Sequence, residues 1–248
     1  MRYFFLCLIF HSLSVSAQRH VRDSSINMMI SGLNYKFNLT GGDLNDRWGF
    51  NSEIGFDLHY KFKNNLTVGI DGGFIFGNQF KQPEIFDDLV NSYGTITSLG
   101  GTPADVLFLM RGAHGAATAG YIFNRLGNNP NSGLWINVGA GYLMHKIRIE
   151  SIYDDVPQLE GDNRKGYDRL TMGFSTKQFI GYVFQHDYRF LNFYAGFEFI
   201  QGFTHNVRNY NFDLEGPDPG LKLDFIYSIK LGWMIPIYKR APKEYYYN

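Results

Sequence analysis

The sequence has almost no cysteine: its one thiol, Cys7, lies in an apolar stretch near the N-terminus. It also lacks a zinc-ligand spacing, a phosphate-binding loop and a thiol pair, so the common metal, nucleotide and redox sites have no motif here. Lys and Arg number 23, as do Asp and Glu, and the formal net charge is zero. A balanced charge gives no argument for binding nucleic acid. We therefore expect no metal, no cofactor and no nucleic-acid partner.

Long hydrophobic runs are missing beyond the first residues. Residues 1–17 carry Arg2, the apolar run FFLCLIF and small residues three and one positions before a cut at Gln18, which predicts a secretory signal peptide. A lipidated cysteine would stand at the end of the apolar run, so Cys7 is expected to leave with the signal. No later stretch approaches the ~18 apolar residues of a spanning helix, which excludes a helical membrane protein.

Glycine and aromatic residues, in contrast, are abundant, and they alternate. In residues 48–62, WGFNSEIGFDLHYKF, the even positions from Trp48 to Phe62 are mostly bulky and apolar, while the odd positions are glycine or polar. A period of two indicates a β-strand with two different faces. Aromatic rings against lipid, with glycine and charge inside a narrow lumen, are typical of an outer-membrane barrel strand, which needs only ~9–11 residues to span. We expect part of this long strand to project beyond the bilayer.

The same alternation predicts eight strands, near residues 26–39, 48–62, 66–77, 106–124, 134–144, 172–184, 191–203 and 221–237. The register of the first and fourth strands stays open, the fourth because HGAATAG is small on both faces. Short connectors at Lys63, Arg125 and Gln185 alternate with long ones at Thr40, Asn78, Ser151 and His205. This pattern predicts an all-β, eight-stranded antiparallel transmembrane outer-membrane β-barrel over residues 18–238. Both termini, including a tail at 239–248, are then expected in the periplasm.

The inward-facing positions include charged residues of both signs. They are Glu53, Asp57, His59, Asp71, Lys177, Glu198, Lys222, Asp224 and Lys230. The interior of an eight-stranded barrel is just wide enough for side chains to fill, and buried ions persist only when they are paired. We therefore predict a lumen ion network that plugs the barrel, and the alternative is a proton path through His59.

The C-terminal tail is basic and rich in tyrosine. Its candidate partner-binding residues are Arg240, Lys243, Tyr245, Tyr246 and Tyr247. Tyrosine provides contact area at a low entropic cost, which favours a docking peptide. The alternative is a frayed terminus.

The sequence contains no convincing arrangement of catalytic residues. Some eight-stranded barrels modify lipid A with a histidine and a serine or an acid near the membrane surface. His145, Ser175 and Glu198 could be combined in this way, but they belong to different predicted strands and nothing in their spacing requires them to meet. We predict that the protein is not an enzyme.

Three stretches in the second half of the chain carry a resemblance. VPQLEGDNRKGYDRLTMGFSTKQFIGY, NFYAGFEFIQGFTHNVRNYNFD and LGWMIPIYKR resemble PorG-like outer-membrane barrel proteins of the Bacteroidota type IX secretion and gliding machinery. The resemblance implies a barrel set in outer-membrane lipid that anchors periplasmic proteins or lipoproteins of a secretion complex. The alternatives are an adhesin or envelope-stability barrel acting through extracellular loops such as residues 78–105, and a lipid A-modifying enzyme.

Overall fold

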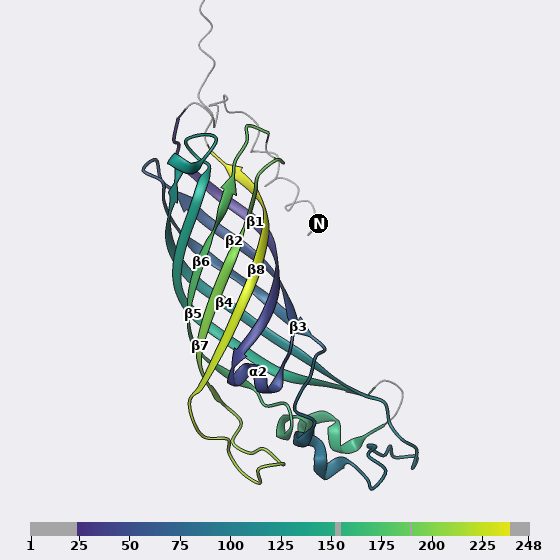
Figure 1. The fold of residues 1–248 in the computed structure, drawn as a ribbon. Helices are drawn as coiled ribbons and strands as arrows, with labels where there is room; N and C mark the ends of the chain where they lie inside the picture. The colour runs from purple at the N-terminus through teal and green to yellow at the C-terminus, as the bar shows by residue number, and fades with distance from the viewer. Residues whose placement is uncertain (1–23, 152–154, 189, 239–248) are drawn as a thin grey trace, which may run out of the picture.

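Eight antiparallel strands close into one barrel, in which each strand pairs with its neighbours in sequence and β8 pairs with β1 (Figure 1). The computed structural model describes residues 24–151, 155–188 and 190–238. The strands are β1 (Met28–Gly42), β2 (Asn51–Lys61), β3 (Leu66–Gly77), β4 (Val106–Phe123), β5 (Gly133–Ser151), β6 (Thr171–Phe184), β7 (Phe193–Asn206) and β8 (Lys222–Ile237). The predicted eight-stranded antiparallel barrel is confirmed.

Both predicted terminal segments lie outside the described residues: the signal peptide at 1–17 and the tail at 239–248. The tail includes Arg240, Lys243, Tyr245, Tyr246 and Tyr247. Among the described residues, no helix is long and apolar enough to cross a membrane.

The barrel wall is apolar outside and polar inside. On β2, the Ile54 and Phe56 side chains are 56% and 50% exposed, whereas Glu53 and Asp57 are buried. In water, such a wall would leave large apolar surfaces exposed and bury charges, so the fold requires an apolar solvent around it. The faces predicted for this strand from Phe50 onward are confirmed.

The structure also settles the register of β4. His114 and Thr118 are buried in the lumen, while Gly115 and Ala117 face outward. Because the outward residues of this stretch are small, they make no strong apolar pattern, and the sequence alone left the two faces open.

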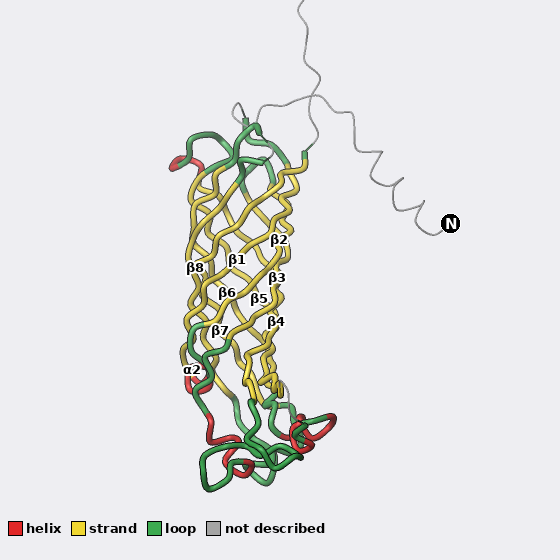
Figure 2. Tube along the Cα trace, turned by 90° about the vertical axis from the view of Figure 1, so that its right-hand side faces the viewer, coloured by secondary structure: helices red, strands yellow, loops and turns green. Residues whose placement is uncertain are grey.

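The two ends of the barrel differ (Figure 2). The end from which β1 starts and at which β8 finishes has the connectors 62–65, 124–132 and 185–192; the opposite end has 43–50, 78–105, 152–170 and 207–221. We call them the short-turn end and the long-loop end. The three long connectors predicted from Asn78, Ser151 and His205 are confirmed, but the one predicted as long at Thr40 is wrong, because 43–50 is no longer than 185–192.

The connectors at the long-loop end are folded, which the sequence did not predict. They contain α2 (Asp43–Arg47) and the 3-10 helices η2 (Pro83–Leu89), η4 (Pro157–Leu159) and η5 (Gly161–Gly166), while η3 (Asn124–Leu126) lies in a short turn. The outward position predicted for Trp48 is wrong, because β2 begins only at Asn51. Trp48 is instead buried against Phe80, with ring centroids 5.3 Å apart.

Candidate functional site: a charged lumen beneath a packed cap

Glu198 on β7 is the centre of the charged lumen. Its buried carboxylate forms ion pairs with three lysines, with Lys36 of β1 at 2.5 Å, Lys177 of β6 at 3.2 Å and Lys230 of β8 at 3.3 Å. All four side chains are almost fully buried. One carboxylate thus joins four strands across the interior.

Each of these lysines also holds a second carboxylate, on β2 or β3. The pairs are Lys36–Glu53 at 2.9 Å, Lys230–Asp57 at 2.7 Å and Lys177–Asp71. Because the two partners of each lysine come from opposite sides of the barrel, the ion pairs span the lumen. Buried ions are stable only when they are paired in this way.

The network carries an excess of negative charge. It contains three lysines and four carboxylates, so one negative charge is uncompensated when the nearby histidines are neutral. His59 lies 3.7 Å from Asp57 and His114 lies 4.0 Å from Glu53, measured between ring nitrogen and carboxylate oxygen. Protonation of one histidine would balance the charge.

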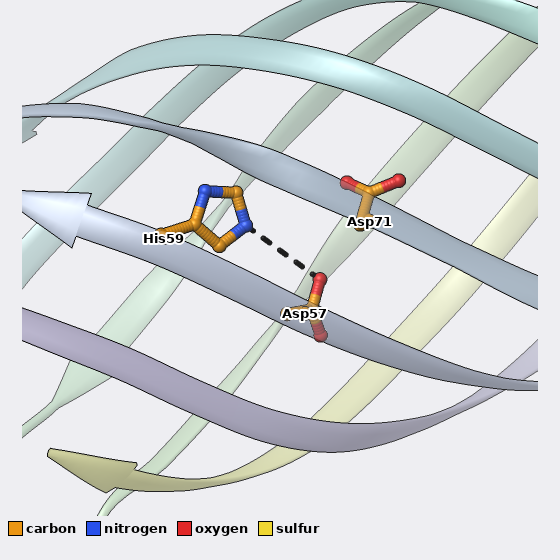
Figure 3. A group of neighbouring side chains, drawn as sticks. All are labelled: Asp57, His59 and Asp71. Carbon is orange, nitrogen blue, oxygen red and sulfur yellow. Dashed lines mark ion pairs between the residues drawn. The ribbon is translucent and has the colours of Figure 1, made fainter.

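Asp57, His59 and Asp71 also have the spacing of a metal site, since one ligand atom from each lies within 4.8 Å of the others (Figure 3). However, Lys230 already pairs with Asp57, and Lys177 already pairs with Asp71. A divalent cation would have to displace both ammonium groups, so we assign these residues to the ion network.

Aromatic rings pack the lumen between the network and the short-turn end. Trp135 contacts Phe179 and Tyr194 edge to face, with ring centroids 5.5 and 5.6 Å apart. The Lys230 ammonium lies 5.5 Å from the centroid of the Tyr194 ring, and the Tyr194 hydroxyl donates to Asp57. The rings therefore cover one side of the network with apolar surface while still satisfying its charges.

On the other side, an apolar layer separates the network from the long loops. It consists of the buried side chains Ile75, Met110, Leu143, Ile147, Ile200 and Ile226. Above it, Phe86 of η2 stacks on Phe108 with centroids 4.0 Å apart and on Tyr167 at 5.6 Å. We call the described parts of the four connectors at the long-loop end the cap. The cap has its own core, continuous with the lumen.

Ion pairs tie the β5–β6 connector to the β7–β8 connector within the cap. Arg169 pairs with Asp213 and, at 3.1 Å, with Asp218, and Arg208 pairs with Asp168 at 2.5 Å. Hydrogen bonding to Asp168 raises the pKa of Arg208. These bonds fix the two connectors against each other.

The structure brings most of the predicted lumen residues together. Glu53, Asp57, His59, Asp71, Lys177, Glu198 and Lys230 lie in or beside one network. Asp224 is separate, with His145 at 2.9 Å, and Lys222 pairs with Asp218 of the cap at 3.2 Å. Among the described residues, no hydrogen bond or ion pair joins His145 or Ser175 to Glu198.

Sequence reasoning missed Lys36 and His114. Lys36 lies between two aromatic residues of β1 that face outward, Tyr35 and Phe37, so the period of two does place it inward. His114 belongs to the stretch with small residues on both faces and gave no such signal.

A closed eight-stranded wall, apolar outside and filled with paired charges inside, defines an outer-membrane β-barrel. No protein-family profile and no curated protein matches the chain. Solved structures with a similar shape include Ail, the attachment invasion locus protein of Yersinia pestis, with TM-score 0.44 and 10% identity over 86% of this chain and 99% of that one. OprG from Pseudomonas aeruginosa has TM-score 0.42 and 11% identity over 86% and 97%, and Neisserial surface protein A has 0.40 and 9% over 84% and 96%. At this level the similarities carry no conclusion about ligands or partners.

Proposed function

We propose that the protein is a non-enzymatic scaffold of the bacterial outer membrane that acts through its cap at the cell surface. The observation that supports this is the combination of a filled lumen with long loops folded around their own core. A barrel that uses its interior for ion pairs has little room for transport. In the orientation usual for such barrels, the short turns face the periplasm and the long loops face outward.

The cap offers contact residues for a partner. Tyr93 and Leu99, both in the β3–β4 connector, are 89% and 75% exposed, and Tyr210 and Leu214 of the β7–β8 connector are half exposed. Exposed aromatic and aliphatic side chains on a rigid support are typical anchors of protein interfaces. An adhesin or envelope-stability role fits this surface.

Replacing residues 78–105 with a short Gly-Ser linker tests the cap. The variant is expected to insert into the membrane but to fail to restore attachment and detergent resistance in a deletion strain, because the main contact segment is gone. Heat-modifiable migration in gels confirms that the barrel is folded. Full complementation by this variant would rule out a function of this connector.

A second candidate function is the anchoring of periplasmic components of a type IX secretion complex. It is favoured by the position of Ile237, since β8 ends at the short-turn end and the basic, tyrosine-rich tail follows there. In this proposal Arg240, Lys243, Tyr245, Tyr246 and Tyr247 dock the partner. Deleting residues 239–248 should then abolish co-purification of secretion components. The variant with a linker in place of residues 78–105 should still co-purify them. Co-purification with the tail deleted would exclude docking through the tail.

A further inference from the structure

The outer wall of the barrel turns basic near the long-loop end of β4 and β5. In the outward-facing ladder, Ala113 is paired with Met144, Arg111 with Lys146, and Leu109 with Arg148. We call Arg111, Lys146 and Arg148 the basic patch. It lies on the lipid-facing side of the wall, where the rest of the ladder toward the short-turn end is apolar.

The protein compensates little of this charge. Like charges directly opposite each other across two strands are destabilising, and Arg111 and Lys146 are such a pair. Arg148 has Glu150 at 2.5 Å, and Arg111 donates to the carbonyl oxygen of Met110. Lys146 has no hydrogen bond or ion pair among the described residues. Three cations against one carboxylate leave a site for an external anion.

The height of the basic patch matches a membrane boundary. From Arg111 to Tyr121, an outward aromatic near the short-turn end, β4 advances about 33 Å at ~3.3 Å per residue. A strand tilt of about 40° turns this into a height of roughly 25 Å, which is the height of the apolar band of such barrels. The patch therefore lies where lipid headgroups begin.

A groove in the wall lies on the membrane side of the patch. Its floor includes Gly115 and Ala117 of β4, and Ile70 and Tyr142 stand on either side. A Cβ atom at Gly115 would meet nothing nearer than the carbonyl oxygen of Asp71 at 4.0 Å, so the floor is open. Gly115 lies about 13 Å along the strand from Arg111 at ~3.3 Å per residue. The groove thus lies at the depth of the acyl chains, below the headgroup level of the basic patch.

We propose that the basic patch and this groove bind a phosphorylated membrane lipid of the leaflet at the long-loop end. The guanidinium groups and the Lys146 ammonium bind the headgroup phosphate, and an acyl chain lies in the groove. Arginine and lysine are the residues best suited to phosphate, and basic clusters beside membrane-spanning segments bind anionic headgroups. The negative phosphate balances the excess positive charge of the basic patch, and the acyl chain covers the open floor of the groove.

Native mass spectrometry of the full-length barrel in detergent tests this inference. The probes are bisphosphorylated lipid A, phosphatidylcholine and inorganic phosphate. The unmodified barrel is expected to retain lipid A and to bind phosphatidylcholine weakly. The variant Arg111→Ala/Lys146→Ala/Arg148→Ala should bind lipid A at least roughly tenfold more weakly, because charge-assisted hydrogen bonds are lost.

Two further variants separate the patch from general charge and from the groove. Lys63→Ala/Lys81→Ala/Lys165→Ala removes the same charge from exposed loop positions and should bind lipid A like the unmodified barrel. Gly115→Leu fills the groove and should weaken lipid A binding while leaving inorganic phosphate unaffected. The proposal would be overturned if the patch variant bound lipid A as tightly as the unmodified barrel does, or if the unmodified barrel retained phosphatidylcholine as well as lipid A. If the patch variant lost lipid A but Gly115→Leu bound it normally, the acyl-chain site in the groove would be overturned.

Discussion

Lys230→Met is expected to destabilise the folded barrel by about 3–5 kcal/mol, the cost of leaving buried charges without their partner. Lys230 is the shared partner of Asp57 at 2.7 Å and Glu198 at 3.3 Å, and it is almost fully buried. Methionine keeps most of the side-chain volume, so the change removes charge and little packing. The network would then hold two lysines against four carboxylates. Urea unfolding in lipid vesicles, followed by tryptophan fluorescence, measures the loss.

Two controls distinguish lost pairing from other effects of this substitution. Lys165→Met removes a lysine whose side chain is 59% exposed in the cap, and it should leave the free energy of unfolding unchanged. Lys230→Met combined with Asp57→Asn restores the original excess of one carboxylate, so it should cost less than the sum of the single changes. Additive costs, or a stable Lys230→Met barrel, would contradict the role of the network.

Ile54→Arg is expected to cost about 2–4 kcal/mol, the range for a cation near the bilayer midplane. Ile54 faces outward from β2, between the outward rings of Phe50 and Phe62, so an arginine there must enter hydrocarbon. The free energy of unfolding in vesicles measures the effect. The same change at Leu107 is a matched control, because Leu107 is an outward residue of β4 beyond the basic patch and should tolerate arginine at a cost of about 0–1 kcal/mol. If the ranking were reversed, the assigned membrane band would be wrong.

The barrel could be predicted from the sequence because its signal is local. Strand geometry alternates side chains between two faces, so residues such as Phe56 and Asp57 report their environment without knowledge of their partners. The alternation also placed Glu198 and Lys230 inside. Alternation gives no answer where both faces are small, as around His114, and it misleads where the strand has not yet begun, as at Trp48.

The pairing inside the lumen and the folded cap could not be predicted in this way. Which lysine meets which carboxylate depends on the stagger of strands that are distant in sequence, as for Lys177 and Asp71. The cap forms through long-range contacts such as Phe86 with Tyr167, and its polar, turn-rich sequence gives no periodic signal. For the same reason Lys222 was predicted in the lumen, although it pairs with Asp218 in the cap.

A scaffold that acts through its cap, as we propose, needs no open pore, and the paired charges close the lumen of this barrel. Current recordings across planar lipid bilayers containing the purified barrel test this closure most directly. We expect no discrete current steps, because the ion network, the rings around Trp135 and the apolar layer fill the interior. Reproducible steps of a water-filled pore, obtained from fully folded protein, would contradict the account.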